Sequence, residues 1–352
     1  MKKTFSILLL IVSSFILIAC NGKKNPIEGT FNKTFYSMDT TIQLVIGEND
    51  PKLNNAPKVF DEIEDVFNKL HELTNNFESF SNVNNIYYIN EHVGKKILID
   101  PLLYDVLEKS LQIYDLTEGY FDISIGHIID EWKYIINLPE KDKLNESELQ
   151  AFIENVQSIP VVKNGIELTK ENNQHFVKIS EGVKIDLGAI AKGYAVNLAK
   201  EILDKYEITM YQLKASDSSA YYGINDHKDR DHFRVGLLRP LSSNNADPFY
   251  GVVSIKNRAL TTSGDSIQSV IYDTQKFHHI VSPVTKMPEN FYSMITLLHD
   301  DAAFADAITT ALMSMPKDVL EAFILEENLE IIIYNFDETI ESFVSEAIFE
   351  ER

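Results

Sequence analysis

The sequence predicts an α+β fold: a single domain with mixed or antiparallel sheets and flanking helices. Two observations support this class. Short strand-like runs cluster between residues 210 and 298, apart from the amphipathic helical stripes, rather than alternating with them as in a doubly wound parallel sheet. No internal repeat or low-complexity break interrupts the chain after about Phe31. We therefore expect one continuous domain that covers residues 31–348.

The expected elements follow from local periodicity. Alternation of apolar and polar residues predicts a strand over residues 40–46. A stripe at 3.6-residue spacing after Pro57, which includes Phe60, Ile63 and Phe67, predicts a core-facing helix. Further helices are expected over residues 101–116, 191–206 and 302–325, the last as a pair. Strands over 330–334 and 341–344 should complete the sheet.

Composition limits the classes of function. The chain has 352 residues, of which 44% are apolar and 24% charged, an ordinary globular composition that excludes collagen, coiled coil and general disorder. It carries 53 acidic residues against 32 basic ones, a formal charge of −21. Such a charge repels phosphate backbones at long range. We therefore expect no nucleic-acid partner.

The N-terminus has the features of an export signal. Lys2 and Lys3 precede an apolar run over residues 5–19, which is too short to span a bilayer comfortably. The run closes with Leu17-Ile18-Ala19-Cys20, and Cys20 is the only cysteine. This ending resembles the cleavage box of bacterial lipoproteins. The resemblance implies a signal peptide over residues 1–19, acylation of Cys20 (palmitate among the acyl chains), and a tether over residues 20–30. The domain would then be lipid-anchored to the cell membrane and face outside the cytoplasm.

Asp306 and Thr310 form the first candidate site. They lie four residues apart in a predicted helix, so a carboxylate and a hydroxyl share one face. Such hard oxygen ligands suit Mg²⁺, which usually completes its octahedron with water and substrate phosphate. An Asp near a helix start also stabilises the helix dipole, so the spacing alone leaves both roles open.

A second candidate is the segment over residues 183–195, where a strand ends and a helix opens. Its small residues and exposed N–H groups would let a phosphate or a ring edge approach closely. The segment has neither the Gly-Lys-Ser/Thr phosphate loop nor G-x-G-x-x-G. A tight turn with a solvated Lys192 is the alternative.

The His278-His279 pair follows Thr261-Thr262-Ser263-Gly264-Asp265 in the chain. Neighbouring side chains on a strand point in opposite directions, so at most one of the two imidazoles can face a shared site, as a proton acceptor. Zinc is disfavoured because neither a cysteine partner nor a His-x₃-His spacing is present. The aromatic residues over 119–122, with Trp132 after them, fit either a pocket for a planar ring or ordinary core packing.

The order of these motifs is more specific than any one of them. The ordered set is Met38-Asp39-Thr40-Thr41, Gly119-Tyr120-Phe121-Asp122, Asp186-Leu187-Gly188, Ala191-Lys192-Gly193-Tyr194-Ala195, Thr262-Ser263-Gly264-Asp265, His279-Ile280 with Pro283, and Ala305-Asp306-Ala307 with Thr310. Over residues 31–344 the chain resembles the ApbE-type FAD:protein FMN transferase family. The resemblance implies an ApbE-like domain and Mg²⁺-dependent transfer of FMN from FAD to a Thr or Ser hydroxyl of an acceptor protein. The products would be a phosphoester-linked flavin and AMP.

The resemblance also implies roles for individual residues. Asp306 and Thr310 match side-chain ligands of Mg²⁺, Ala189 matches a position that gives a backbone oxygen to the metal, and His279 matches the general base. The positions expected around FAD are Met38, Phe80, Tyr120, Phe121, Asp122, Asp186 and Lys192.

Some positions depart from the family pattern. Asn197 stands where Asp is common, Ser216-Asp217 where Gly-Gly is usual, Lys286 where a glycine is expected, and His127 where Pro is frequent. Two other activities use the same ligands: a lipid-anchored FAD-binding protein without transfer, and a Mg²⁺-dependent FAD pyrophosphatase that gives FMN and AMP. Retention of Asp306, Thr310 and His279 argues against the binding protein. The same ligands would serve transferase and pyrophosphatase alike, so the sequence does not separate these two.

Overall fold

The computed structural model describes residues 29–216, 218–240, 247–266 and 268–352. The predicted signal peptide, Cys20 and Asp217 lie outside the described residues. The α+β prediction is confirmed, because helices flank sheets whose paired strands run antiparallel. Among the described residues, no helix combines the length and apolar character needed to cross a membrane.

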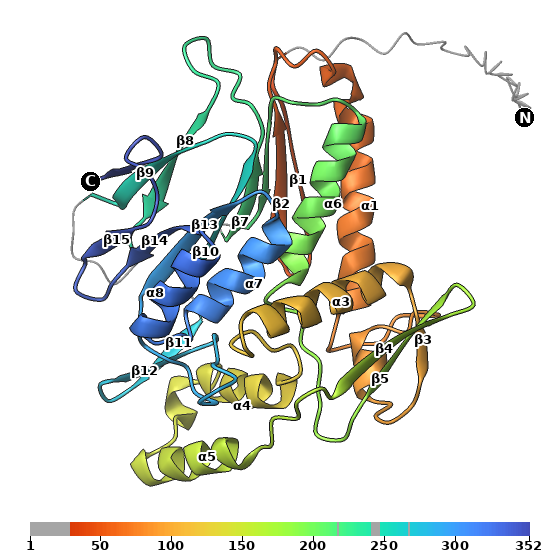
Figure 1. Ribbon diagram of the computed structural model, residues 1–352, viewed down its shortest axis with the longest axis vertical. Coiled ribbons are helices and arrows are strands. Elements are labelled where there is room, and N and C mark those ends of the chain that lie inside the picture. Colours follow the sequence, from red (N-terminus) through yellow and green to blue (C-terminus); the bar gives the residue numbers. More distant parts are fainter. Residues whose placement is uncertain (1–28, 217, 241–246, 267) are drawn as a thin grey trace, which may run out of the picture.

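An eight-stranded antiparallel sheet forms the centre of the molecule (Figure 1). In spatial order its strands are β1 (Phe31–Ser37), β2 (Thr40–Ile46), β6 (Tyr211–Ala215), β7 (Ser219–Tyr222), β10 (Arg258–Gly264), β13 (Met294–His299), β14 (Glu330–Tyr334) and β15 (Ile340–Ser342). Other elements pack on both faces of this sheet, and a separate apolar core lies on each face.

Helices cover one face of the central sheet. They are α1 (Ala56–Thr74), α6 (Ala191–Lys205), α7 (Ala302–Leu312) and α8 (Lys317–Glu326), and they bury the largest apolar cluster against the strands. The opposite face packs on a second, three-stranded sheet of β8 (Phe233–Leu238), β9 (Phe249–Ile255) and β16 (Phe349–Glu351). Strand β16 lies just past the expected domain end at Ile348 and pairs with β9.

Smaller elements complete the fold. They are the 3-10 turns η1 (Leu53–Asn55) and η2 (Glu140–Asp142), the helices α2 (Ile86–Asn90), α3 (Pro101–Leu116), α4 (Gly126–Ile136) and α5 (Glu146–Ser158), the sheet of β3 (Ile97–Ile99), β4 (Ile166–Glu171) and β5 (Gln174–Ile179), and the hairpin of β11 (Ser269–Tyr272) and β12 (Gln275–His278). Figure 1 shows the hairpin between α4 and the central sheet. Trp132 of α4 stacks on Phe277 of β12, with ring centroids 5.1 Å apart.

Several predicted bounds agree with the structure, and others do not. The strands at 40–46 and 330–334 and the helix at 101–116 have the predicted limits, whereas β15 lies at 340–342 instead of 341–344. β1, α4 and α5 were not predicted. β1 is an edge strand with Phe31 and Ser37 buried only at its two ends, so it shows no sustained alternation.

A glycine brings α6 and α7 into close contact. A Cβ atom at Gly193 would lie 2.2 Å from the carbonyl oxygen of Ala302 and 2.8 Å from Cβ of Asp306. The first turn of α6 therefore rests directly on the start of α7. This contact places the α6 N-terminus beside Asp306.

We predict that Gly193→Ala destabilises the fold. Alanine favours a helix by about 1 kcal/mol over glycine, but overpacking against a backbone oxygen typically costs about 1–3 kcal/mol, so the steric effect should prevail. Urea unfolding measures the change. Glu201→Ala, at an exposed position of the same helix, is the control and should not lower stability. Equal or greater stability of Gly193→Ala would show that the helices separate at no cost.

Candidate active site

Asp306 lies where three elements meet. Its side chain, in α7, is only 5% exposed. One carboxylate oxygen, Oδ2, accepts a hydrogen bond of 3.0 Å from the backbone N–H of Gly193, at the start of α6. The other, Oδ1, accepts a bond of 3.3 Å from the hydroxyl of Ser219, at the start of β7. Ser219 belongs to the hydroxyl-rich Ser218-Ser219 pair that follows the Ser216-Asp217 departure, but its contact with Asp306 was not predicted.

The start of α7 is fixed by a short polar network. The Asp301 carboxylate caps the helix by accepting from the N–H of Phe304 at 2.9 Å. Asn197 of α6 donates to Asp301 Oδ1 at 2.6 Å and accepts from the N–H of Ala302 at 2.7 Å. Asn197, which departs from the family pattern, therefore takes part in capping α7.

The Asp306 carboxylate is short of positive charge. Burial raises its pKa, while nearby Lys192 and the bonds from Gly193 and Ser219 oppose the rise. Among the ion pairs of the described residues, none includes Asp306. A buried carboxylate without a bonded cation is unfavourable in its ionised form. A divalent cation at this position would supply the missing charge.

The other predicted metal ligands fit a hard cation. Thr310 lies one turn after Asp306 and donates its hydroxyl hydrogen to the Asp306 carbonyl at 3.1 Å, which leaves the hydroxyl lone pairs available. Ala189 lies half-buried in the turn just before α6. Across the described ranges, no three His, Cys, Asp or Glu side chains gather into a metal cluster. The donor set is thus one carboxylate, one hydroxyl and a carbonyl, all oxygen, as Mg²⁺ prefers.

Asp186 anchors the turn that leads into α6. Its Oδ1 accepts from the N–H of Gly188 at 2.7 Å, and its Oδ2 accepts from Lys133 at 2.9 Å and from Asn76 at 3.1 Å. Burial alone would raise the pKa of Asp186, but Lys133 and these hydrogen bonds hold it below its usual value. Asp186 is therefore ionised and well compensated.

Lys133 and Asn76 are site residues that the sequence did not reveal. Lys133 comes from α4, and its ammonium also lies 5.7 Å from the ring centroid of the exposed Phe77. Both residues reach Asp186 across long stretches of chain. No local spacing connects them with the Asp186-Leu187-Gly188 motif.

The segment over residues 120–124 runs directly beside Asp186, whose backbone N–H donates to the carbonyl of Ile123 at 2.9 Å. Asp122 accepts from the N–H of Ser124 at 2.7 Å, and burial raises its pKa. Tyr120 is half-buried, whereas Phe121 is 3% exposed. Phe121 therefore belongs mainly to the apolar core.

Trp132 is also a core residue. It is fully buried, and its indole N–H donates to the carbonyl of Lys286 at 2.8 Å. Of the two roles left open for this aromatic residue, the structure shows core packing.

One ring nitrogen of His279 has no hydrogen-bond partner. This atom, Nδ1, is buried, while the backbone N–H of His279 donates to the carbonyl of Gln268 at 3.0 Å. Burial, followed by the charge of His278 and the ammonium groups of Lys192 and Lys133, lowers the pKa of His279 to about 4. The imidazole is therefore neutral near pH 7, the form that can accept a proton.

His278 points elsewhere, as the strand geometry predicts. It is fully buried, its Nε2 lies 2.9 Å from the carbonyl of Glu289, and its Nδ1 accepts from the N–H of Ile280 at 3.2 Å. Because Nδ1 accepts, Nε2 carries the hydrogen. The two histidines therefore differ in role: His278 is bonded on both sides, and His279 is not.

Shared neighbours connect these groups into one region. Lys192 acts electrostatically on both Asp306 and His279, and Lys133 acts on both Asp186 and His279. The structure thus gathers a carboxylate without a bonded cation, a neutral imidazole and two ammonium groups around the N-terminus of α6. That combination suits an anionic ligand and a proton transfer.

Met38 and Phe80 are the remaining positions expected around FAD. Met38 and Asp39 form the turn between β1 and β2 with φ of 51° and 57°, a left-handed conformation that disfavours side chains. Phe80 is half-buried and contacts the ring of His71, with centroids 6.0 Å apart. No described hydrogen bond or ring contact joins either residue to Asp306 or His279.

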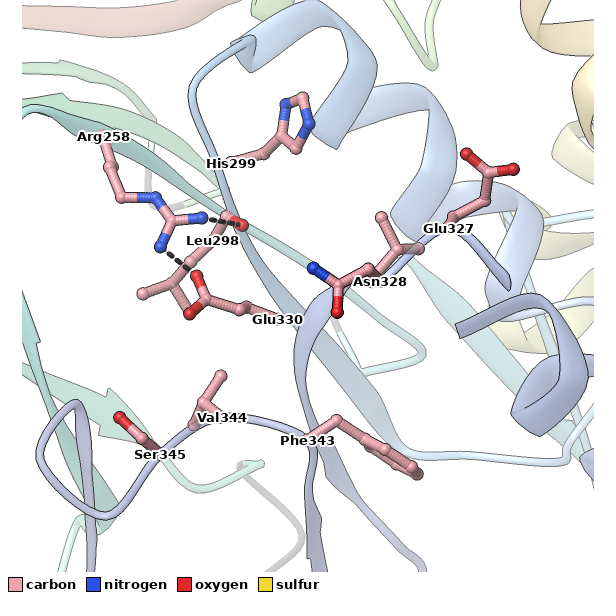
Figure 2. Close-up of a pocket in the computed structure, with 10 residues that line it drawn as sticks. Arg258, Leu298, His299, Glu327, Asn328, Glu330, Phe343, Val344 and Ser345 are labelled. Atoms are coloured by element: carbon pink, nitrogen blue, oxygen red, sulfur yellow. Dashed lines mark hydrogen bonds and ion pairs between the residues drawn. The ribbon is translucent and has the colours of Figure 1, made fainter. Parts of the chain in front are cut away.

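The pocket in Figure 2 is a separate feature. It has a volume of about 330 Å³ and lies between the start of β10, the end of β13 and the start of β14. Arg258 in it bonds to Glu330 and, at 2.9 Å, to the carbonyl of Leu298. None of the predicted site residues lines this pocket.

Two curated relatives match most of this chain. An FAD:protein FMN transferase of Haemophilus influenzae is 22% identical over 99% of this chain and 96% of its own length. One from Chlamydia pneumoniae is 24% identical over 86% of this chain and 88% of its own length.

Solved structures share the fold. The crystal structure of the ApbE protein from Thermotoga maritima superposes with a TM-score of 0.72 at 22% identity, and covers 90% of this chain and 97% of its own. The flavin transferase ApbE from Vibrio cholerae gives 0.70 at 19%, with the same two coverages. The sequence model of the ApbE family matches residues 38–333, well over half of the sequence. This chain belongs to the ApbE family.

Proposed function

We propose that this chain is an FAD:protein FMN transferase that moves FMN from FAD onto a Thr or Ser hydroxyl of an acceptor protein. The observation that carries the proposal is that one lysine, Lys192, acts electrostatically on both the neutral His279 imidazole and the Asp306 carboxylate. The relative from Haemophilus influenzae that bears this name matches nearly the whole chain, which supports the same conclusion.

The reaction is phosphoryl transfer. His279 accepts the proton of the acceptor hydroxyl, whose oxygen attacks the FMN-side phosphorus of FAD. The bond between that phosphorus and the bridging oxygen breaks, and AMP leaves with the oxygen. Positioning and electrostatics account for most of the rate enhancement in such transfers.

The start of α6 provides the anion site. The N–H groups of Ala191 and Gly193 already donate to the Leu187 carbonyl and to Asp306. Lys192, on the first turn with its ammonium 3.3 Å from the carbonyl of Gly188, therefore supplies the positive charge that attracts phosphate. Asp186 and the segment over residues 120–122 flank this turn and hold its backbone in place. Together these groups orient FAD relative to His279.

Mg²⁺ is part of the proposal. Asp306, Thr310 and the backbone oxygen of Ala189 would hold it, and a bound Mg²⁺ would neutralise the charge that develops on the pyrophosphate. The buried carboxylate that lacks a bonded cation supports this assignment.

The location is proposed from the leader. The apolar run that ends at Cys20 supports acylation of this cysteine and a lipid anchor that keeps the domain at the outer side of the cell membrane. The acceptor protein would then also lie outside the cytoplasm.

The direct test is the mass of an acceptor domain from a flavinylated protein, incubated with the purified chain, FAD and Mg²⁺. We expect one FMN per acceptor, bound after denaturation, together with an equal amount of AMP. Omission of the chain is the control. Free FMN plus AMP with an unmodified acceptor would identify a pyrophosphatase instead, and intact FAD would identify a binding protein.

We predict that Asp306→Asn lowers the turnover number by about 10²-fold or more, since a metal ion contributes several kcal/mol of charge stabilisation. The Mg²⁺ concentration for half-maximal rate should rise as well. The control is Asp300→Asn, whose side chain is 84% exposed just before α7. Unchanged Mg²⁺ dependence in Asp306→Asn would place the metal elsewhere.

The pH profile tests His279. A general base works in its neutral form, and with a pKa of about 4 it stays neutral well below pH 6.5. We therefore expect kcat/KM to hold steady from pH 7 to about pH 5 and to fall only as the pH approaches 4. His279→Gln should lower kcat by about 10²- to 10⁴-fold with little change in FAD affinity. His127→Gln, at an exposed position, is the control. A loss confined to FAD affinity would contradict the role of a base.

A further inference from the structure

The strand that leads to His279 belongs to a small hairpin. β11 and β12 pair only with each other among the described strands. Two-stranded hairpins are marginally stable by themselves. Contacts outside the hairpin must therefore fix the end of β12, where His279 follows.

One face of β12 packs on apolar residues. Phe277 is fully buried against Trp132 of α4, in a cluster that also holds Val270 and Tyr272 of β11. This packing keeps the hairpin on α4. It does not by itself connect the hairpin to the central sheet.

The opposite face of β12 carries Lys276 and His278, because alternate residues share a face. The ammonium of Lys276 lies 2.6 Å from Oδ2 of Asp265, the residue that follows β10 of the central sheet. The Asp265 side chain is 1% exposed and that of Lys276 is 24% exposed. A buried ion pair therefore connects the hairpin to the central sheet.

The Lys276–Asp265 ion pair is hydrogen-bonded to the segment that precedes β13. Asp265 donates its backbone N–H to the carbonyl of Ser293 at 3.1 Å, and its Oδ1 accepts from the Ser293 hydroxyl at 3.4 Å. Asn290 donates to the carbonyl of Lys276 at 2.9 Å, and His278 donates to the carbonyl of Glu289. These bonds fix the backbone immediately before His279 on its polar side.

We propose that Lys276 is a positioning residue for His279, because its ion pair with Asp265 holds the end of β12 against the central sheet and so aims the imidazole at the acceptor hydroxyl. The inference rests on the proposed function, in which His279 is the base. Lys276 makes no contact with FAD in this scheme. It acts through the orientation of the neighbouring imidazole.

The experiment compares Lys276→Met, which keeps the aliphatic stem and removes the charge, with Lys276→Arg and with Lys143→Met. Lys143 is a matched control because its ammonium also reaches the hairpin, at the carbonyl of Ile271, 3.4 Å away, but on strand β11. The readouts are kcat for transfer to an acceptor domain and the Kd of FAD from flavin fluorescence quenching.

We expect Lys276→Met to lower kcat by about 10- to 100-fold with the Kd of FAD nearly unchanged, because small misplacements of a reacting group cost this much. Lys276→Arg should restore most of kcat, and Lys143→Met should match the unmodified chain. If Lys276 acts through His279, Lys276→Met/His279→Gln should be no slower than His279→Gln alone.

Opposite results would overturn the proposal. Unchanged kcat in Lys276→Met, or losses that multiply in the double variant, would show that Lys276 does not act through His279. Because loss of one partner leaves a buried charge unpaired, Asp265→Asn/Lys276→Met replaces Lys276→Met if that variant fails to fold, and full activity of this neutral pair would equally refute the proposal. Failure of the proposed function differs: the unmodified chain would then form no covalent flavin, or His279→Gln would transfer at the normal rate.

Discussion

The buried carboxylate of Asp306 is the constraint on which the candidate site depends. It joins the start of α6, through Gly193, to the start of β7, through Ser219. Two hydrogen bonds only partly offset the cost of burying a charge, and an apolar residue would serve packing better at this position. A group that weakens the fold and is nevertheless held by three elements indicates a functional requirement. Residue 193 is glycine for the same reason. α6 must approach α7 closely enough for the Gly193 N–H to reach the Asp306 carboxylate, and a side chain would prevent this.

Local charge differs from the charge of the whole chain. The net charge of −21 opposes long-range attraction of any anion, yet Lys192 and Lys133 both lie close enough to lower the pKa of His279. Asp186 neutralises much of Lys133 through their ion pair, so Lys192 is the more available of the two. An anionic dinucleotide would thus meet a confined positive region rather than a positive surface. Burial, above all, keeps the His279 imidazole neutral, and the same two ammonium groups lower its pKa further.

The sequence predicted features that depend on residues close together in the chain, and it missed contacts between residues far apart in the chain. Periodicity located α3 and β2 because Pro101 and the alternation over residues 40–46 are local signals. Helical spacing placed Asp306 and Thr310 on one face of α7. The contacts of Ser219, Asn76 and Lys133 were not predictable, because each residue meets its partner across 53 or more residues of chain and no local pattern encodes strand order or helix packing. The role of Ala189 came from family resemblance alone, since a backbone oxygen leaves no mark in the sequence.

Two departures from the family pattern stand at positions with a left-handed backbone. Ser216 and Lys286 both adopt φ of 60°, the left-handed region in which a side chain costs about 1–2 kcal/mol. Each has contacts that offset this cost. The Ser216 hydroxyl lies 2.8 Å from that of Ser218, and Lys286 accepts from the Trp132 indole and donates to the carbonyls of Gln157 and Ile159 at 2.6 and 2.7 Å. Lys286 thereby joins α5 to the loop that follows His279, a connection that glycine could not make. At this position the side chain itself takes part in holding α5 against the loop that follows His279.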